Sequence, residues 1–455
     1  MGKYPPSSSS LPILVSGRLQ AWISDLARHK LLEVCRSGIT IGTLRIIDST
    51  GTYSFGDLDN DKGRVITIQV TNRAFWTRVL FGGDLGFSEA YLVGDIKISD
   101  LEGVVELWFD NRSGLTGLST FTARVVSFVT ALSSAILGQT HTMSRLNVIA
   151  SYDTSNAFFQ CFLSTEMQYS CGLWDTPEHG VNGDLLFGPT LDDLESAQRR
   201  KLHHVLRAAR VKPGYRILEF GTGWGALSIT AAKYYGCRVD TITLSIEQKK
   251  LAEERIQAEG LQDAITVHLC DYRELPASFE KAFDAFVSIE MVEHVGSKHY
   301  KTFFEIIDWA LKSDNAAAVI TSTTMPDFRW TPYQEQDFIR RYMWPHSSLP
   351  SPTCLITAAS AASNSRLELE SVENHSSHYP RTLRTWSRRL QINFPQWRDT
   401  IIKDRPALED PAELDAFLRK WRYMFVYAAA GFAKGHITSH MLSWRRDNMD
   451  IMESN

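Results

Sequence analysis

Three glycines, Gly221, Gly223 and Gly225, alternate with other residues directly after an apolar run that contains the carboxylate Glu219. Glycine lacks the Cβ atom that keeps a backbone away from a ligand, so this spacing predicts close backbone contact with a bound molecule. The NAD pattern needs G-x-G-x-x-G and a later acid, but here the next apolar run ends at residues 243–245 without one. The arrangement favours a cationic amino-acid ligand such as S-adenosylmethionine over a dinucleotide.

The surrounding pattern predicts the elements that position this loop. Helical periodicity covers residues 190–211, 226–236 and 246–261, and apolar runs typical of strands cover 215–221, 238–245, 264–275, 283–296 and 316–325. Strands that alternate with helices predict an α/β fold, a Rossmann-like parallel sheet that is doubly wound. In such a sheet the ligand lies at the carboxyl ends of the strands, where the glycines fall.

Composition and pattern divide the chain into four segments. Residues 1–17 are predicted to be a disordered tail, and 18–112 a smaller N-terminal α+β domain with strands near 42–48, 51–57 and 64–70. Residues 113–148 are interpreted as a connector and 149–455 as the cofactor-binding domain. Within the connector, residues 117–138 are weakly apolar, which fits either a packed amphipathic helix or one at a membrane surface.

Charge and cysteine content argue against several classes of protein. A net charge of −4 gives no basic field that would attract nucleic acid. The six cysteines contain no C-x-x-C pair, which argues against a metal site or a disulfide framework and for a reducing, cytoplasmic location. The N-terminus has too short an apolar run for a secretory signal.

Several stretches then occur in a recognisable order: "QYSCGLW", "LESAQRRKLHHVL", "LEFGTGWG", "TLSIEQKKLAEERI", "DYRELP" and "SIEMVEHVG". Together they resemble the cyclopropane-fatty-acid synthases and the related mycolic-acid methyltransferases. The stretch "SIEMVEHVG" is more similar to the fungal and plant branches of this family than to the bacterial ones. The resemblance is strong from about residue 150 to 310 and fainter from about 35 to 445. It implies a class I methyltransferase fold and S-adenosylmethionine held by Tyr169, Ser170, Gly221, Gly223, Thr243, Leu244, Gln248 and Ile289.

The resemblance also implies a chemistry, methyl transfer to an alkene followed by removal of a proton by a bound bicarbonate. In the family a cysteine, a glutamate, a histidine and a tyrosine hold that anion; Cys171 and Glu293 match the first two. The histidine position falls near Ser322, and the tyrosine aligns with Met424, one residue after Tyr423. We therefore expect Glu293, Cys171 and Tyr423 to be catalytic, with bicarbonate in doubt. Aromatic candidates for stabilising a carbocation are Tyr169, Trp174, Tyr423, Phe425 and Tyr427.

Three functions remain open from the sequence. The first is an S-adenosylmethionine-dependent C-methyltransferase that acts on an unsaturated acyl lipid and forms a cyclopropane or a methyl branch. The second is the same class of enzyme acting on a specialised metabolite, a polyketide or a terpenoid, and the third is a non-catalytic cofactor- or lipid-binding protein. Peripheral membrane contact and a homodimer are both compatible with the sequence, which decides neither.

Overall fold

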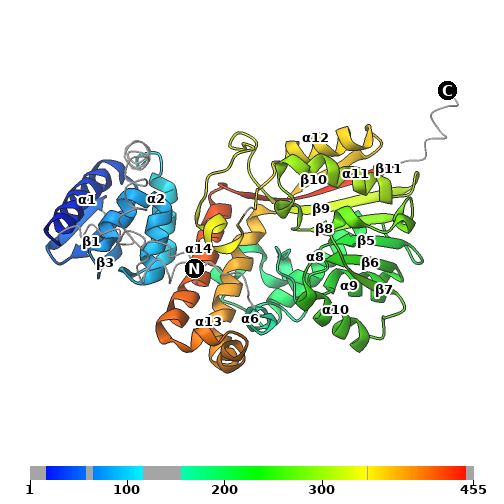
Figure 1. Cartoon of the computed structure of the whole chain (residues 1–455), viewed down its shortest axis with the longest axis horizontal. Coiled ribbons are helices and arrows are strands. Elements are labelled where there is room, and N and C mark those ends of the chain that lie inside the picture. The colour runs from blue at the N-terminus through cyan, green and yellow to red at the C-terminus, as the bar shows by residue number, and fades with distance from the viewer. Residues whose placement is uncertain (1–16, 58–64, 116–154, 346, 447–455) are drawn as a thin grey trace, which may run out of the picture. The chain divides into compact units, whose positions relative to one another are not determined.

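The computed structural model describes residues 17–57, 65–115, 155–345 and 347–446 (Figure 1). The described residues form two compact units. The first comprises the described residues up to 115 together with Asp337–Met343 and Leu408–Tyr423, and the second comprises the rest. Residues 1–16 of the predicted tail (1–17) and most of the predicted connector, including 117–138, lie outside the described residues, whereas Gly17 begins a helix.

The first unit is a small α+β arrangement. In chain order it contains α1 (Gly17–Gly38), β1 (Thr43–Asp48), β2 (Gly51–Gly56), β3 (Val65–Val70), α2 (Ala74–Val93), β4 (Ile96–Ile98) and α3 (Leu101–Asn111). The sheet order is β2-β1-β3-β4, with β1 and β3 parallel and the outer pairs antiparallel. The three predicted strands of this region are present as β1, β2 and β3.

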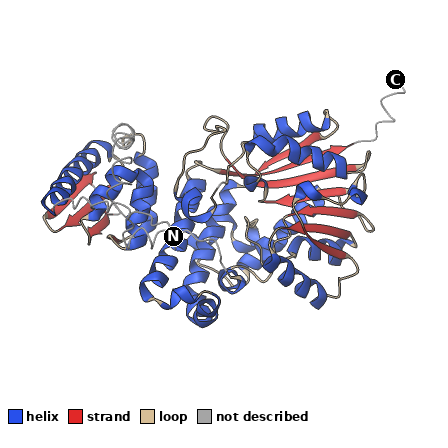
Figure 2. Ribbon diagram, in the orientation of Figure 1, coloured by secondary structure: helices blue, strands red, loops and turns tan. Residues whose placement is uncertain are grey.

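The second unit is built on a seven-stranded sheet (Figure 2). Its strands are β5 (Arg216–Phe220), β6 (Arg238–Thr243), β7 (Ile265–Leu269), β8 (Ala285–Ile289), β9 (Ala316–Thr324), β10 (Glu368–Asn374) and β11 (Thr438–Arg446). The strand order is β10-β11-β9-β8-β5-β6-β7, and β5 to β9 are mutually parallel. β10 and β11, which the sequence did not predict, add an antiparallel edge, so the sheet is mixed.

Helices cover both faces of this sheet, as predicted. They are α6 (Asn156–Phe162), α7 (Gly183–Leu186), α8 (Asp193–Ala208), α9 (Ala226–Tyr235), α10 (Ile246–Ala258), α11 (Tyr300–Ala310), α12 (Pro352–Ser363) and α13 (Tyr379–Asp404). Neighbouring strand residues point to opposite faces. Ile217 packs in one core with residues of α8, α9 and α10, and Leu218 packs in another with residues of α11 and α12.

Late segments of the chain belong to the first unit, and the domain boundaries expected from the sequence stay a prediction. Helix α14 (Pro411–Ala433) contributes to both, because its residues up to Tyr423 belong to the first unit and those from Met424 to the second. The ring of Tyr423 lies 5.8 Å from that of Tyr91, and Tyr342 donates a 2.8 Å hydrogen bond to Glu89, so late segments complete the early unit. No helix among the described residues is both long and apolar enough to span a bilayer.

Candidate active site

The glycine loop leaves β5 at the carboxyl edge of the sheet. Gly221, Gly223 and Gly225 have φ values of 90°, 51° and 85°, which side chains other than glycine rarely adopt. The amides of Gly221 and Thr222 both donate to the carbonyl of Ile242 on β6, at 3.1 and 3.0 Å, and fix the loop against its neighbour. A Cβ atom at Gly223 would meet no atom within 4 Å. The loop therefore offers open backbone beside the sheet edge.

A buried ammonium group lies beside Ser170. Lys201 on α8 donates to the Ser170 hydroxyl at 2.6 Å and to the Gln168 amide oxygen at 2.5 Å. Burial lowers the pKa of Lys201 to about 8. Gln198, one helical turn earlier, donates to the Ser170 carbonyl at 2.8 Å, and its own buried amide oxygen has no hydrogen-bond partner among the described residues.

These groups fit the amino-acid part of S-adenosylmethionine. A lysine cation and a serine hydroxyl suit a carboxylate, and an unsatisfied amide oxygen suits an ammonium group. Glu219 is also buried here and accepts a hydrogen bond from Ser228, and burial raises its pKa to about 7. Lys201 and Gln198 were not singled out from the sequence, although both stand in a quoted motif and their spacing of three places them on one helix face.

The other predicted cofactor residues follow β6 and β8. The buried Thr243 hydroxyl donates to the Gln248 amide oxygen at 2.9 Å, and Ser245 caps α10 by accepting from the Gln248 amide at 3.2 Å. Leu244 is exposed, and Ile289 ends β8 with partial exposure. All eight predicted cofactor residues lie in the second unit, which brings them to one edge of one sheet or to the segment that precedes α8.

Two acids follow β8, and both are tied to distant segments. Glu290 accepts from the Cys171 amide at 3.0 Å through Oε1 and from the Tyr379 hydroxyl at 2.5 Å through Oε2. Glu293 accepts from the Thr323 amide at 2.5 Å through Oε1, and its buried Oε2 has no hydrogen-bond partner among the described residues. Burial, and then the charge of Glu290, raises the pKa of Glu293 to about 8. Burial also raises the pKa of Glu290.

The predicted catalytic residues are therefore only partly brought together. Cys171 and Glu293 both lie in the second unit, where Glu290 contacts the Cys171 amide and its charge acts on Glu293. Burial raises the pKa of the Cys171 thiol far above its usual value, so this thiol is not a nucleophilic thiolate. Tyr423 belongs to the first unit, where its ring packs 4.7 Å from Phe338. Tyr379, which the sequence did not single out, supplies the phenol that contacts an acid.

Aromatic rings surround Tyr169. Its ring is stacked at 5.1 Å on Trp386 and meets Phe159 at 5.2 Å and Trp344 at 6.1 Å. Trp174, also considered for stabilising a cation, instead faces the guanidinium of Arg381 at 4.2 Å. Of these two candidates, Tyr169 is the one whose ring stays within an aromatic cluster.

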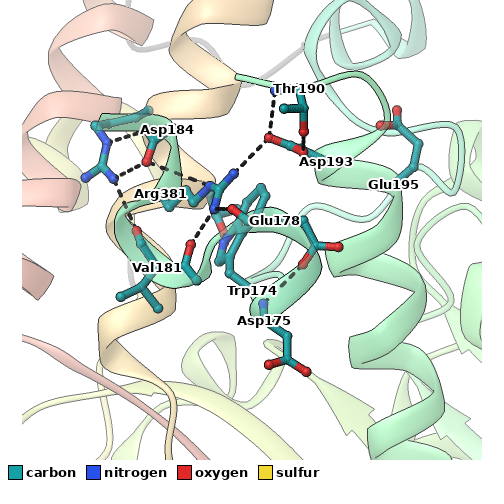
Figure 3. A network of polar contacts seen from close by, with 12 residues as sticks. Trp174, Asp175, Glu178, Val181, Asp184, Thr190, Asp193, Glu195 and Arg381 are labelled. Carbon is teal, nitrogen blue, oxygen red and sulfur yellow. Dashed lines mark hydrogen bonds and ion pairs between the residues drawn. The ribbon is translucent and has the colours of Figure 1, made fainter. Parts of the chain in front are cut away.

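A buried ion-pair network fixes the helix that carries Tyr379 (Figure 3). Arg381, only 1% exposed, lies two residues after Tyr379 on α13. It donates to Asp193 at 2.8 Å and also bonds the carbonyls of Glu178 and Gly180. The first turn of α13 is thereby held against the segment that precedes α8, and Tyr379 is held with it.

The implied bicarbonate fits this site poorly. The Cys171 amide and the Tyr379 hydroxyl already donate to the carboxylate of Glu290, and a further anion beside that carboxylate would be repelled. The residues at the implied histidine and tyrosine positions, Ser322 and Met424, supply neither an imidazole nor a phenol. At this site the donors of Cys171 and Tyr379 therefore hold the carboxylate of Glu290 and not a free anion.

A separate cluster on the β10 side consists of His204, Glu373 and His375. Its possible ligand atoms lie within 4.8 Å of one another. Glu373 Oε2 lies 2.7 Å from the His204 ring nitrogen and 3.1 Å from that of His375. These partly buried groups hydrogen-bond to one another, so their polar atoms find partners within the cluster.

The sheet order and the glycine loop at its carboxyl edge define the class of fold, the Rossmann-like fold of class I S-adenosylmethionine-dependent methyltransferases. The fold is similar to that of mycolic acid cyclopropane synthase CmaA1 complexed with SAH and CTAB, with a TM-score of 0.53 and 24% identity over 68% of this chain and 99% of that one. It is also similar to coclaurine N-methyltransferase, with a TM-score of 0.56 and 17% identity over 81% of this chain and 100% of that one. At such identities the likeness shows the fold.

Sequence comparison shows the family. The family model "Mycolic acid cyclopropane synthetase" matches residues 139–441. Tuberculostearic acid methyltransferase UfaA1 of Mycobacterium tuberculosis is 31% identical over 78% of this chain and 77% of its own length. The cyclopropane-fatty-acyl-phospholipid synthase of Escherichia coli is 31% identical over 73% of this chain and 78% of its own length. The chain belongs to the mycolic acid cyclopropane synthetase family, which confirms the predicted resemblance, the enzyme class and the cofactor.

Proposed function

We propose that this enzyme methylates a double bond in the acyl chain of a lipid and forms a cyclopropane or a methyl branch. The observation that carries the proposal is Glu290, whose carboxylate is held by the Cys171 backbone amide and the Tyr379 hydroxyl. An alkene offers no acidic proton before methylation, so a base is needed only after the new carbon–carbon bond has formed. The names of the relatives, a tuberculostearic acid methyltransferase and a phospholipid synthase, support an acyl lipid.

The residues of the site suit each stage of this chemistry. S-adenosylmethionine, when bound, supplies an electrophilic methyl group. Attack by the alkene leaves a positive charge on the neighbouring carbon, and the face of an aromatic ring such as Tyr169 stabilises a cation in a dry site. Loss of a proton from the new methyl group then closes a cyclopropane, and loss from the neighbouring chain carbon gives a methyl-branched alkene. Neither outcome needs a reductant.

Labelled cofactor tests the proposal. The enzyme is incubated with methyl-labelled S-adenosylmethionine and vesicles of a phospholipid whose acyl chains contain one cis double bond. Vesicles of the matched saturated phospholipid are the control. We expect label in the fatty acids released from the unsaturated vesicles and none in those from the saturated vesicles.

A parallel incubation with an extract of polar and apolar metabolites tests the alternative, in which the substrate is a specialised metabolite and not an acyl lipid. Label that enters a polyketide or terpenoid in preference to phospholipid would overturn the proposal and support the specialised-metabolite enzyme. The departures at Ser322 and Met424 from the implied anion ligands favour that alternative, since a substrate with its own acidic proton needs no bicarbonate.

A further inference from the structure

Glu290 occupies an unusual position. It follows β8 directly and has a φ of +48°, a left-handed conformation that is uncommon outside glycine. Its amide donates to the Thr321 carbonyl at 2.9 Å, which fixes the turn. Strained backbone of this kind persists where the surroundings determine it, and it clusters at functional sites. The strain here aims a carboxylate at Cys171 and Tyr379.

The surroundings of Glu290 suit an ionised carboxylate. Each of its oxygens accepts one hydrogen bond, from the Cys171 amide at 3.0 Å and from the Tyr379 hydroxyl at 2.5 Å. Burial raises the pKa of Glu290, and these two donors and the Lys201 cation act against that rise by stabilising the charged form. Glu290 as a residue nevertheless remains partly exposed, whereas Glu293 is only 6% exposed. Of the two acids, Glu290 is the one a substrate can reach.

Glu293 complements Glu290 as the acid that keeps its proton. Burial and the Glu290 charge together raise the Glu293 pKa to about 8, so Glu293 stays largely protonated at neutral pH. Two neighbouring acids cannot readily both ionise, and the pair therefore carries one charge. That charge resides on the partly exposed member.

We propose that Glu290 is the proton acceptor of the reaction and that its side-chain carboxylate replaces the bicarbonate implied by the family resemblance. This inference rests on the proposed function. After methyl transfer, the electron pair of a substrate C–H bond forms the new carbon–carbon bond or double bond, and the proton passes to a Glu290 oxygen. The proton then passes from the Glu290 carboxyl group to solvent. Cys171 and Tyr379 act as positioning residues through their hydrogen bonds to Glu290.

Three variants and two buffers test this assignment. Glu290→Gln keeps the shape of the side chain but cannot accept the proton. Glu290→Gly removes the carboxylate, relieves the left-handed strain and leaves room for a free anion. Glu305→Gln, which alters an exposed acid paired with Lys301 on α11, is the matched control. Each protein is assayed on unsaturated vesicles in decarbonated buffer and in buffer with added bicarbonate, and its affinity for S-adenosylmethionine is measured by calorimetry.

We expect wild type and Glu305→Gln to turn over equally in both buffers. Glu290→Gln should lose about 10²- to 10⁴-fold in kcat, the usual contribution of a proton-transfer group, with cofactor affinity within about twofold of wild type. Glu290→Gly should be equally slow without bicarbonate and recover at least tenfold when bicarbonate is added, on the same scale of proton-transfer effects.

Other results would overturn the assignment. Wild-type turnover that disappears on decarbonation and returns with bicarbonate would show that the anion, rather than Glu290, is the base. Near-normal turnover by Glu290→Gln would exclude proton transfer to this residue, and so would a loss explained wholly by weaker cofactor binding. Absence of labelled lipid from wild type in both buffers would instead overturn the proposed function, and the role of Glu290 with it.

Discussion

The backbone amide of Cys171 donates a 3.0 Å hydrogen bond to the carboxylate of Glu290, which joins the segment before α8 to the end of β8. Cys171 acts here through its backbone amide, which stabilises the charge of Glu290. Burial raises the pKa of its thiol, which stays neutral. The same carboxylate accepts a hydrogen bond from the hydroxyl of Tyr379 on α13. Three segments distant in sequence thus meet at one charged group.

Tyr379→Phe should change the pH dependence of turnover. The hydroxyl donates to the ionised form of Glu290, so its loss raises the pKa of that carboxyl group. A hydrogen bond to a charged group contributes about 1.5–3 kcal/mol, so we expect kcat at neutral pH to fall roughly tenfold or more. Activity should recover as the pH rises, which a pH–rate profile measures.

The ring of Tyr379 keeps its stacking on Phe432, at 4.2 Å, in the phenylalanine variant. Tyr235→Phe is the control. It removes a hydroxyl on α9 that forms a 3.0 Å hydrogen bond with the His203 ring, and it should leave the pH–rate profile unchanged. A uniform loss of kcat at every pH would mean that the hydroxyl does not act through the ionisation of Glu290.

Glu293→Gln should make stability less dependent on pH. The pKa of Glu293 is raised from 4.5 to about 8, so between these values the folded state holds a proton that the unfolded chain has lost. Stability therefore falls as the pH rises through this window. Glutamine has no such proton, and the melting temperature of Glu293→Gln relative to wild type should rise by roughly a few degrees between about pH 5 and pH 8.

The same variant separates the roles of the two acids. Because Glu293 keeps its proton near neutral pH, Glu293→Gln should retain kcat within about tenfold of wild type, less than the loss typical of a proton-transfer group. Thermal denaturation and turnover are measured on the same preparations. A melting temperature that follows wild type at every pH would contradict the raised pKa, and a loss as large as that of Glu290→Gln would make Glu293 the acceptor.

Lys201→Met should weaken cofactor binding. The buried ammonium group contacts Ser170, where the methionine carboxylate is expected, and hydrogen bonds to charged groups contribute about 1.5–3 kcal/mol. We expect the dissociation constant for S-adenosylmethionine to rise at least tenfold. In wild type the affinity should also fall as the pH rises above about 8, where Lys201 loses its charge.

Titration calorimetry at several pH values checks both statements. Lys201→Met should lack the alkaline decline, because methionine has no charge to lose. Equal affinities of variant and wild type would place the carboxylate of the cofactor elsewhere.

Arg381→Met should be among the most destabilising single changes in the second unit. It removes a guanidinium that is 1% exposed and leaves the Asp193 carboxylate, 2.8 Å from it, without this partner (Figure 3). Breaking a buried pair in this way costs about 3–5 kcal/mol. Denaturant titration measures the loss, and Arg199→Met, which breaks a half-exposed pair with Glu166, should change the midpoint little.

The sequence predicted the parts of the fold that have a clear period. The runs that became β5 to β9 are apolar and alternate with helices, and the glycine loop follows the first of them. β10 was missed because its residues, "ELESVEN", are polar and mostly exposed at the sheet edge. Its pairing with β11 depends on segments about 70 residues apart, which local periodicity cannot reveal.

The sequence predicted only those site residues that stand in a recognisable motif. Cys171, Glu293 and the glycines stand in recognisable stretches, whereas Tyr379 lies in "HSSHYP", which has no distinctive pattern. Tyr423 was predicted from the family resemblance and stays a prediction; its ring packs against Tyr91 and Phe338 in the first unit. Glu290 stood in a quoted motif, yet only its contacts with Cys171 and Tyr379 reveal a role.

The most direct test of the account is a mass spectrum of lipid after incubation with S-adenosylmethionine that carries a fully deuterated methyl group. With monounsaturated phospholipid vesicles, we expect a deuterated carbon bonded to the former alkene carbons. In a cyclopropane product this carbon bridges both of them and has lost one deuterium, and in a methyl-branched alkene it is bonded to one of them and has kept all three. Both products require the proton loss assigned to Glu290, and Glu290→Gln should give neither at more than about a hundredth of the wild-type rate. A deuterated methyl group found only on a nitrogen, oxygen or sulfur atom, or only in a non-lipid product, would contradict this expectation.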